Sequence, residues 1–165
     1  MFLRKKLFST ENVVKEFWKE YQKLPLPDRR KEHLWIMLLD FDFSVIGIFL
    51  IRTVTPESNE IKLKEVFSYP LYFNAPFFIL CHNHPSNWVE FSKEDKEFTK
   101  NVKEWAEKLG FGFLDHIILT ESGYYSSLRK KLKPKKEIKF IPFRPHMTNL
   151  KSASNILKGL LSKLK

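Results

Sequence analysis

The sequence of 165 residues has little cysteine and no long apolar run. Its single cysteine, Cys81, cannot form an intramolecular disulfide, and its apolar neighbours favour a buried thiol in a reducing compartment. No apolar run reaches the roughly 18 residues that a transmembrane helix needs. The basic residues within 1–6 are not followed by the uninterrupted apolar segment of a signal peptide. We therefore expect a cytoplasmic protein with no transmembrane segment.

Most of the chain also lacks an excess of charge of either sign. Residues 1–128 hold 17 basic and 18 acidic side chains, whereas residues 129–165 hold 12 basic side chains and one acid, Glu137. The net charge of +10 therefore comes from the C-terminal tail. Any argument from basicity toward nucleic acid concerns this tail and does not extend to the rest of the chain.

The apolar fraction of 43% predicts one domain with a single core, which we place at residues 1–130. Residues 131–165 are expected to form a basic linker and an amphipathic helix, because leucines recur there at helical spacing among lysines. This helix is expected to dock on its own domain or on a second copy in a homodimer. A membrane surface or nucleic acid is the alternative partner.

The periodicity of apolar residues predicts an α/β fold. Helices are expected from Ser9 or Thr10 to about residue 21, at 60–73 and at 92–109, and strands at 34–39, 45–51, 77–82, 113–120 and 124–128. The first two strands form a predicted hairpin that is buried on both faces, so helices must cover both sides of the sheet. Pro70 makes the second half of the helix at 60–73 doubtful.

Two histidines stand at the end of the apolar strand at 77–82 and just beyond it. Because His82 and His84 are two residues apart, they project from the same face and can point at one ion. Pro85 prevents a helix, and the loop that follows can return the chain so that Asp95 meets both rings. Two neutral nitrogens and one carboxylate suit Zn²⁺ and leave a fourth position for water. A lone histidine here would more often be a structural residue, but the pair with an acid predicts a metal site.

A zinc hydrolase usually also needs a carboxylate that takes and returns the proton of the water. Glu32, at the start of the first strand, is the candidate, and a solvated charge beside basic neighbours is the alternative. Ser92 could donate a hydrogen bond to the oxyanion of a tetrahedral intermediate. Ser92 and Asp95 also have the spacing of a capping box at a helix start, which is the structural interpretation of this pair.

The pattern His82-x-His84, Ser92 and Asp95, with an acid upstream, resembles the JAMM motif of the JAB/MPN metalloproteases. Residues 82–86, 114–118 and 124–126 more narrowly resemble the RadC-like branch of that superfamily. The resemblance covers about residues 9–130 and implies a mixed β-sheet sandwiched by helices, similar to the cytidine-deaminase architecture. It implies zinc on His82, His84 and Asp95. Glu32 would be the general acid and base, Ser92 would lie beside the oxyanion, and the reaction would hydrolyse a peptide or isopeptide bond of a protein substrate.

Some residues and functions keep two interpretations. Asp115 and His116 fit a structural pair within a strand, with a role behind the metal ligands as the alternative. Trp88 and Phe91 either pack down the loop between the ligands or line a substrate groove. RadC-like proteins usually carry glycine at the position of Asn87 and proline at that of Phe91, but asparagine tolerates positive φ, so the turn can form. A nucleic-acid-associated protein, of the DNA-repair or nuclease kind, and a catalytically silent binding module are the competing functions.

Overall fold

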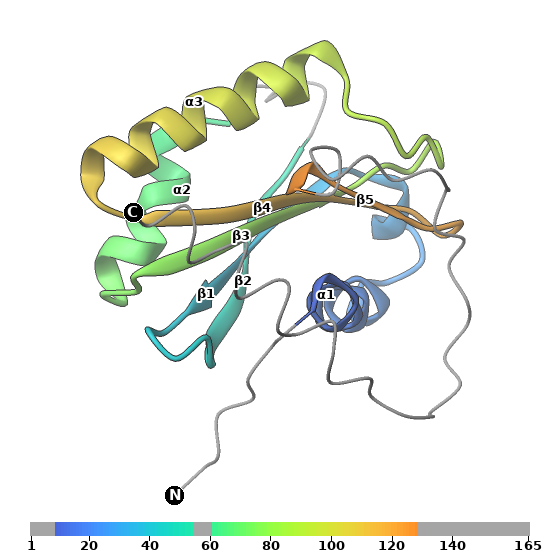
Figure 1. The fold of residues 1–165 in the computed structure, drawn as a ribbon. Helices are drawn as coiled ribbons and strands as arrows, with labels where there is room; N and C mark the ends of the chain where they lie inside the picture. The colour runs from blue at the N-terminus through green and yellow to red at the C-terminus, as the bar shows by residue number, and fades with distance from the viewer. Residues whose placement is uncertain (1–8, 55–60, 129–165) are drawn as a thin grey trace, which may run out of the picture.

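The computed structural model describes residues 9–54 and 61–128 (Figure 1). In chain order its elements are α1 (Thr10–Lys23), the 3-10 turn η1 (Asp28–Arg30), β1 (His33–Leu39), β2 (Val45–Thr53), α2 (Leu63–Tyr72), β3 (Phe77–Asn83), α3 (Lys93–Leu109), β4 (Gly112–Leu119) and β5 (Tyr124–Ser126). The strands form one sheet in the order β2-β1-β3-β4-β5. β3 and β4 are parallel and the other neighbours are antiparallel, so the sheet is mixed.

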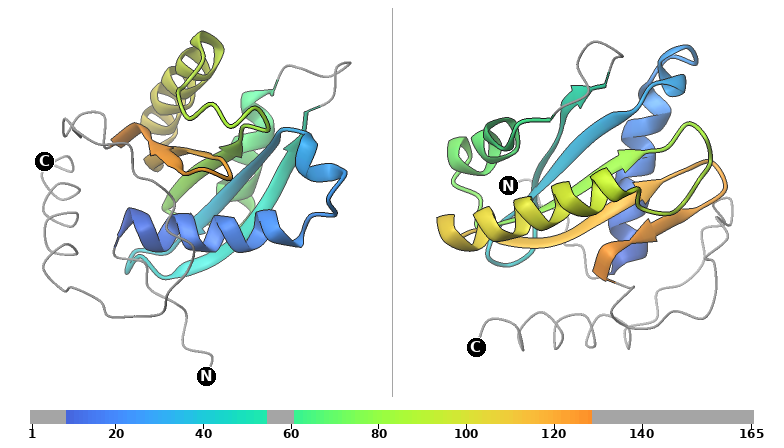
Figure 2. Two further views of the ribbon diagram at one scale, coloured as in Figure 1. Left: turned by 90° about the vertical axis from the view of Figure 1, so that its right-hand side faces the viewer. Right: turned by 90° about the horizontal axis from the view of Figure 1, so that it is seen from above.

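Helices cover both faces of this sheet. α1 lies on one face, and α2 and α3 lie on the other (Figures 1 and 2). β1 is buried along its whole length, and its alternate side chains enter two cores. Trp35 and Met37 pack with α1, whereas Leu34 and Ile36 pack with α2 and α3. The predicted sandwich of helices around a mixed sheet is confirmed, and Cys81 is buried in the core on the α1 face.

Three details of the prediction are wrong. β2 is mostly half-buried and not buried on both faces, because it is an edge strand of the sheet. α2 begins at Leu63 and continues past Pro70 to Tyr72. Pro70 stands in the last turn, so the one backbone hydrogen bond that its missing N–H cannot form is lost at the end of the helix. β5 ends at Ser126, since the next two residues bond to the side chain of Asp115 instead of continuing the strand.

Capping residues define the ends of α1 and α3. The hydroxyl of Ser9 accepts a hydrogen bond from the backbone N–H of Asn12 and caps α1. Gly110 ends α3 at φ 78°, a conformation that glycine adopts without steric cost. Ser92 is the N-cap of α3, which fixes Asp95 in the first turn of that helix.

The predicted basic linker and amphipathic helix at 131–165 lie outside the described residues. Their separation from the domain at 1–130 therefore stays a prediction. Within 9–54 and 61–128, no helix combines the length and the apolar character needed to cross a membrane.

Candidate metal centre

The two histidines lie at the C-terminal end of β3 and just beyond it, beside the parallel strand β4. The backbone N–H of His84 donates to the carbonyl of Leu119 at 3.0 Å, which extends the pairing of the two strands past the end of β3. His82 and His84 are 7% and 9% exposed. Their Nε2 atoms lie 2.8 Å apart, so the predicted convergence of the two rings is present.

The first turn of α3 places Asp95 against both rings. Its Oδ1 lies 3.3 Å from Nε2 of His82, and its Oδ2 lies 3.5 Å from Nε2 of His84. Among the described residues, these three side chains form the one group of histidine, cysteine and acidic side chains that could hold a metal ion. The Ser92 hydroxyl and backbone N–H both donate to Oδ2, at 2.6 and 2.9 Å, which orients the carboxylate.

The Nδ1 atoms of His82 and His84 point away from the cluster, and each has a hydrogen-bond partner there. Nδ1 of His84 lies 2.7 Å from the carbonyl oxygen of Trp88; because a carbonyl only accepts, this nitrogen carries the hydrogen and Nε2 keeps a lone pair. Nδ1 of His82 lies 2.8 Å from Nε2 of His116. Hydrogen bonds on the outer nitrogens are the usual way in which proteins orient histidine ligands.

This donor set fits a zinc ion. Ligand atoms about 2.1 Å from a tetrahedral ion lie about 3.4 Å apart, and the distances from Asp95 to the two rings, 3.3 and 3.5 Å, agree with that spacing. The two Nε2 atoms, at 2.8 Å, would have to separate by about 0.6 Å. Lone pairs of nitrogen and a carboxylate that point at one place repel each other unless a cation or a proton lies between them.

The same convergence shifts the pKa values of the cluster. Burial raises the pKa of Asp95, but hydrogen bonds that His82 and His84 donate from Nε2 when their rings are protonated outweigh burial and hold the pKa well below its ordinary value. Burial lowers the pKa of His84, but the hydrogen bonds that the protonated ring makes with Asp95 and with the Trp88 carbonyl outweigh that effect and raise the pKa. Complete burial lowers the pKa of His116 far below that of a free histidine, so this ring is neutral.

Ser92 has the structural role expected of it, and its role beside an oxyanion stays a prediction. Its hydroxyl accepts the backbone N–H of Asp95 at 3.0 Å, and Asp95 in turn accepts the backbone N–H of Ser92, so the capping box is present. The residue is exposed and lines the cleft beside the three candidate ligands. In this structure its hydroxyl hydrogen points at the Asp95 carboxylate.

Glu32 is exposed at the start of β1 and lines the same cleft as the histidines. Its negative charge contributes to the raised pKa of His84. The backbone on either side of Glu32 is held by Asn83, the residue between the two histidines. The amide oxygen of Asn83 accepts the N–H of His33 at 2.8 Å, and its amide nitrogen donates to the carbonyl of Lys31 at 2.9 Å.

The loop between the ligands forms the turn expected at Asn87. Asn87 has φ 61°, its N–H donates to the carbonyl of His84, and its side-chain oxygen accepts the N–H of Glu121. Phe91 is buried, with its ring 5.0 Å from that of His116, whereas Trp88 is 64% exposed and lines the cleft. The two aromatic residues thus divide the roles: Phe91 packs the loop down and Trp88 faces the cleft.

Asp115 lies away from the cluster that its neighbour His116 adjoins. It pairs with Ile79 in the sheet and lies on the α1 face. Its buried carboxylate accepts hydrogen bonds from the hydroxyls of Ser126 and Ser127 and from two backbone N–H groups. Burial raises the pKa of this carboxyl, and its contacts are those of a residue that anchors β5.

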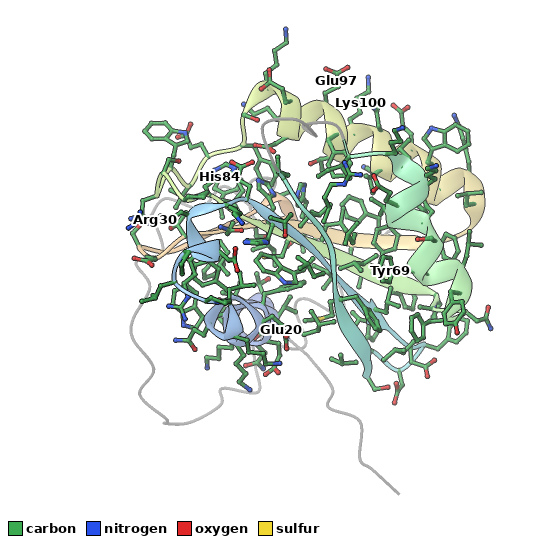
Figure 3. The ribbon with its side chains drawn as sticks, turned by 180° about the vertical axis from the view of Figure 1, so that it is seen from behind. Glu20, Arg30, Tyr69, His84, Glu97 and Lys100 are labelled. Atoms are coloured by element: carbon green, nitrogen blue, oxygen red, sulfur yellow. The ribbon has the colours of Figure 1, made fainter. Side chains whose placement is uncertain are left out.

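The cluster stands in the wall of a cleft of about 1180 Å³. In Figure 3, His84 lies near the start of α3, which is the helix that carries Glu97 and Lys100. The ionisable groups that line the cleft, besides the histidines, are five carboxylates and one amine: Glu32, Glu90, Glu94, Asp95, Glu97 and Lys62. The cleft is therefore acidic, in contrast to the basic tail of the sequence.

Two residues of this centre were not predicted from the sequence. These residues are Asn83 and Thr99. Thr99 stands four residues after Asp95, one helical turn away on the same side of α3, and this spacing was the available signal. Nothing local in the sequence signalled the contacts of Asn83, because its partners, His33 and Lys31, lie about 50 residues earlier in the chain.

The chain is similar in sequence to known proteins. A sequence model of the family described as RadC-like JAB domain matches residues 8–133. A UPF0758 protein of Clostridium kluyveri is 37% identical over 102 residues, which cover 62% of this chain and 44% of that protein. A UPF0758 protein of Pelodictyon phaeoclathratiforme is 33% identical over 124 residues, 75% of this chain and 54% of the relative. The chain spans about half the length of the curated relatives it matches.

Proposed function

We propose that this chain, which belongs to the RadC-like JAB domain family, is a zinc-dependent hydrolase of JAMM type that cleaves a peptide or isopeptide bond. The observation that carries the proposal is the convergence of His82, His84 and Asp95 in the wall of a cleft. A catalytic zinc site uses three protein ligands of this kind. Glu32 lines the same cleft, which is where a general base has to lie.

Each residue has a task that follows from its chemistry. When bound, zinc would lower the pKa of a coordinated water to about 7 and polarise the carbonyl of the scissile bond. Glu32 accepts the proton of the attacking water and returns it to the nitrogen that leaves as the C–N bond breaks. Ser92 donates its hydroxyl hydrogen to the carbonyl oxygen as negative charge develops there. This role requires the hydroxyl to rotate away from Asp95.

The charge of the cleft supports a polypeptide substrate over a nucleic acid. Five carboxylates and one lysine line it, so a phosphate backbone would be repelled and a cationic segment would be attracted. Trp88, with its largely exposed ring, adds an apolar surface beside His84. We therefore propose that the substrate presents lysine or arginine near the bond that is cleaved. Nucleic-acid binding would depend on the tail, outside the described residues.

Metal analysis of the full chain, purified without chelator, is the first test. We expect about one zinc ion per chain, lost on dialysis against a chelator and regained on titration with zinc. The double variant His82→Ala/His84→Ala should not regain it, whereas His146→Ala, beyond the residues 8–133 that match the family model, should behave like the wild type. A wild-type protein that neither contains nor binds zinc contradicts the proposal.

The second test separates a hydrolase from a catalytically silent module. We expect the zinc-loaded chain to cleave members of a peptide library, and Glu32→Gln to reduce the rate by about 10²- to 10⁴-fold while zinc stays bound. Glu104→Gln is the matched control, because Glu104 is an exposed glutamate outside the cleft. A library that is not cleaved contradicts the proposal of a peptide hydrolase, and equal rates for the two variants contradict the assignment of Glu32.

A further inference from the structure

We infer that Thr99 is a positioning residue of the metal centre, which acts through His116 to keep a lone pair on Nε2 of His82 and to hold Asp95 in line with it. The inference rests on the proposed metal site. It concerns a hydroxyl that contacts none of the candidate ligand atoms, so it adds a residue to the centre.

The hydroxyl of Thr99 joins two groups of the centre. Oγ1 lies 2.6 Å from the backbone carbonyl of Asp95 and 2.6 Å from Nδ1 of His116. A hydroxyl has one hydrogen, and a carbonyl only accepts, so this hydrogen goes to Asp95. Oγ1 must then accept from His116, which places the hydrogen of that ring on Nδ1.

The position of the hydrogen on His116 determines which nitrogen of His82 carries a hydrogen. His116 is 1% exposed and lies among the rings of Phe91 and Phe98, at 5.0 and 6.0 Å, where a charged imidazolium is disfavoured. A neutral ring with its hydrogen on Nδ1 accepts at Nε2. Nδ1 of His82, 2.8 Å away, must therefore be the donor. Nε2 of His82 is left with the lone pair that faces His84 and Asp95.

The same hydroxyl also connects two ligands from different elements. Asp95 belongs to the first turn of α3, His82 to β3 and His116 to β4. The path from the Asp95 carbonyl through Thr99 and His116 to His82 returns to the Asp95 carboxylate, 3.3 Å from His82. A shift of α3 along the sheet would break this path, so Thr99 fixes the helix at the place where Asp95 meets the histidines.

Removal of the hydroxyl should therefore weaken metal binding although no ligand is changed. Without Thr99 as acceptor, the hydrogen of His116 can move to Nε2 and be donated to Nδ1 of His82. His82 then carries its own hydrogen on Nε2, the atom that has to bind the metal. Loss of such an outer partner typically reduces metal affinity about 10- to 100-fold.

The test compares Thr99→Val, which keeps the shape of the side chain, with Thr99→Ser, which keeps the hydroxyl. Zinc affinity of the full chain is measured by competition with a chromophoric chelator. ¹⁵N NMR of the histidine rings in zinc-free protein reports which nitrogen of His82 carries the hydrogen. Thermal unfolding of the zinc-free variants checks that both are folded.

We expect Thr99→Val to bind zinc about 10- to 100-fold more weakly and to move the hydrogen of His82 to Nε2, and Thr99→Ser to stay close to the wild type. Wild-type affinity in Thr99→Val, or equal losses in both variants, would overturn the inference. If the wild type itself binds no zinc, the proposed function fails. In that case the NMR comparison still decides the inference, because an unchanged His82 tautomer in Thr99→Val would overturn it independently of any metal.

Discussion

The side chain of Asn83 and the backbone of His33 are joined by a buried hydrogen bond of 2.8 Å. Asn83 is 2% exposed and also donates to the carbonyl of Lys31, so it holds the backbone on both sides of Glu32. The strand residue between the two histidines thus links them to the candidate base. Hydrogen bonds from β3 thus hold the backbone of Glu32 relative to the candidate ligands, and a strand is a more rigid support than a loop would be.

Replacement of Asn83 should separate catalysis from metal binding. We expect Asn83→Ala to destabilise the chain by about 1–3 kcal/mol, because the N–H of His33 loses its buried acceptor. Zinc affinity should change little, whereas peptide hydrolysis should fall by at least about 10-fold, because misplaced catalytic groups lose rate steeply. Urea denaturation, zinc titration and turnover measure the three effects. Unchanged turnover in the folded, zinc-loaded variant would show that Asn83 does not position Glu32.

Zinc binding should depend on pH in a defined direction. The pKa of His84 is raised in the metal-free chain, so its ring remains partly protonated above the ordinary histidine value of about 6.5. Zinc needs the deprotonated nitrogen, and binding therefore releases this proton. Affinity should fall as the pH is lowered from about 8 to 6. Calorimetry in two buffers of different ionisation enthalpy measures the released proton, and equal heats in both buffers would contradict this expectation.

The acidic cleft predicts a preference for cationic peptides, and reversal of its charges should reduce that preference. Glu94 and Glu97 line the cleft from one side of α3, so Glu94→Lys/Glu97→Lys should reduce cleavage of lysine- or arginine-containing peptides by about 3- to 30-fold at low salt. Glu104→Lys/Glu107→Lys is the control, because it reverses two charges of the same helix outside the cleft. Similar losses in both double variants would indicate a general effect of net charge on the reaction.

Asp115 should affect folding but not the metal. Its buried carboxylate accepts two hydroxyl and two backbone hydrogen bonds, so Asp115→Ala should lower the free energy of unfolding by about 3–5 kcal/mol. Zinc affinity of the folded fraction should match that of the wild type. Chemical denaturation and zinc competition measure the two quantities. A loss of affinity as large as that expected for Thr99→Val would assign Asp115 to the metal centre.

Local patterns were sufficient for most elements and for the convergence of the three candidate ligands. Alternation along 77–84 placed His82 and His84 on one face, and the capping signal at Ser92 placed Asp95 in the first turn of a helix. Each of these relationships is set within a few residues of one strand or helix. Such patterns did not reveal that β2 is an edge strand, because the order of strands in a sheet depends on contacts between distant segments.

The sequence by itself determined the order of the elements, the two-sided core and the three candidate ligands, because periodicity and capping are local properties of a chain. Only the tertiary structure decided which residues support those ligands. Thr99 meets His116 across 17 positions, and Asn83 meets His33 across 50. The first contact exists because α3 packs against β4, and the second because β3 lies beside β1 in one register. Strand register and helix placement arise from the packing of the whole core, which no short stretch of sequence encodes.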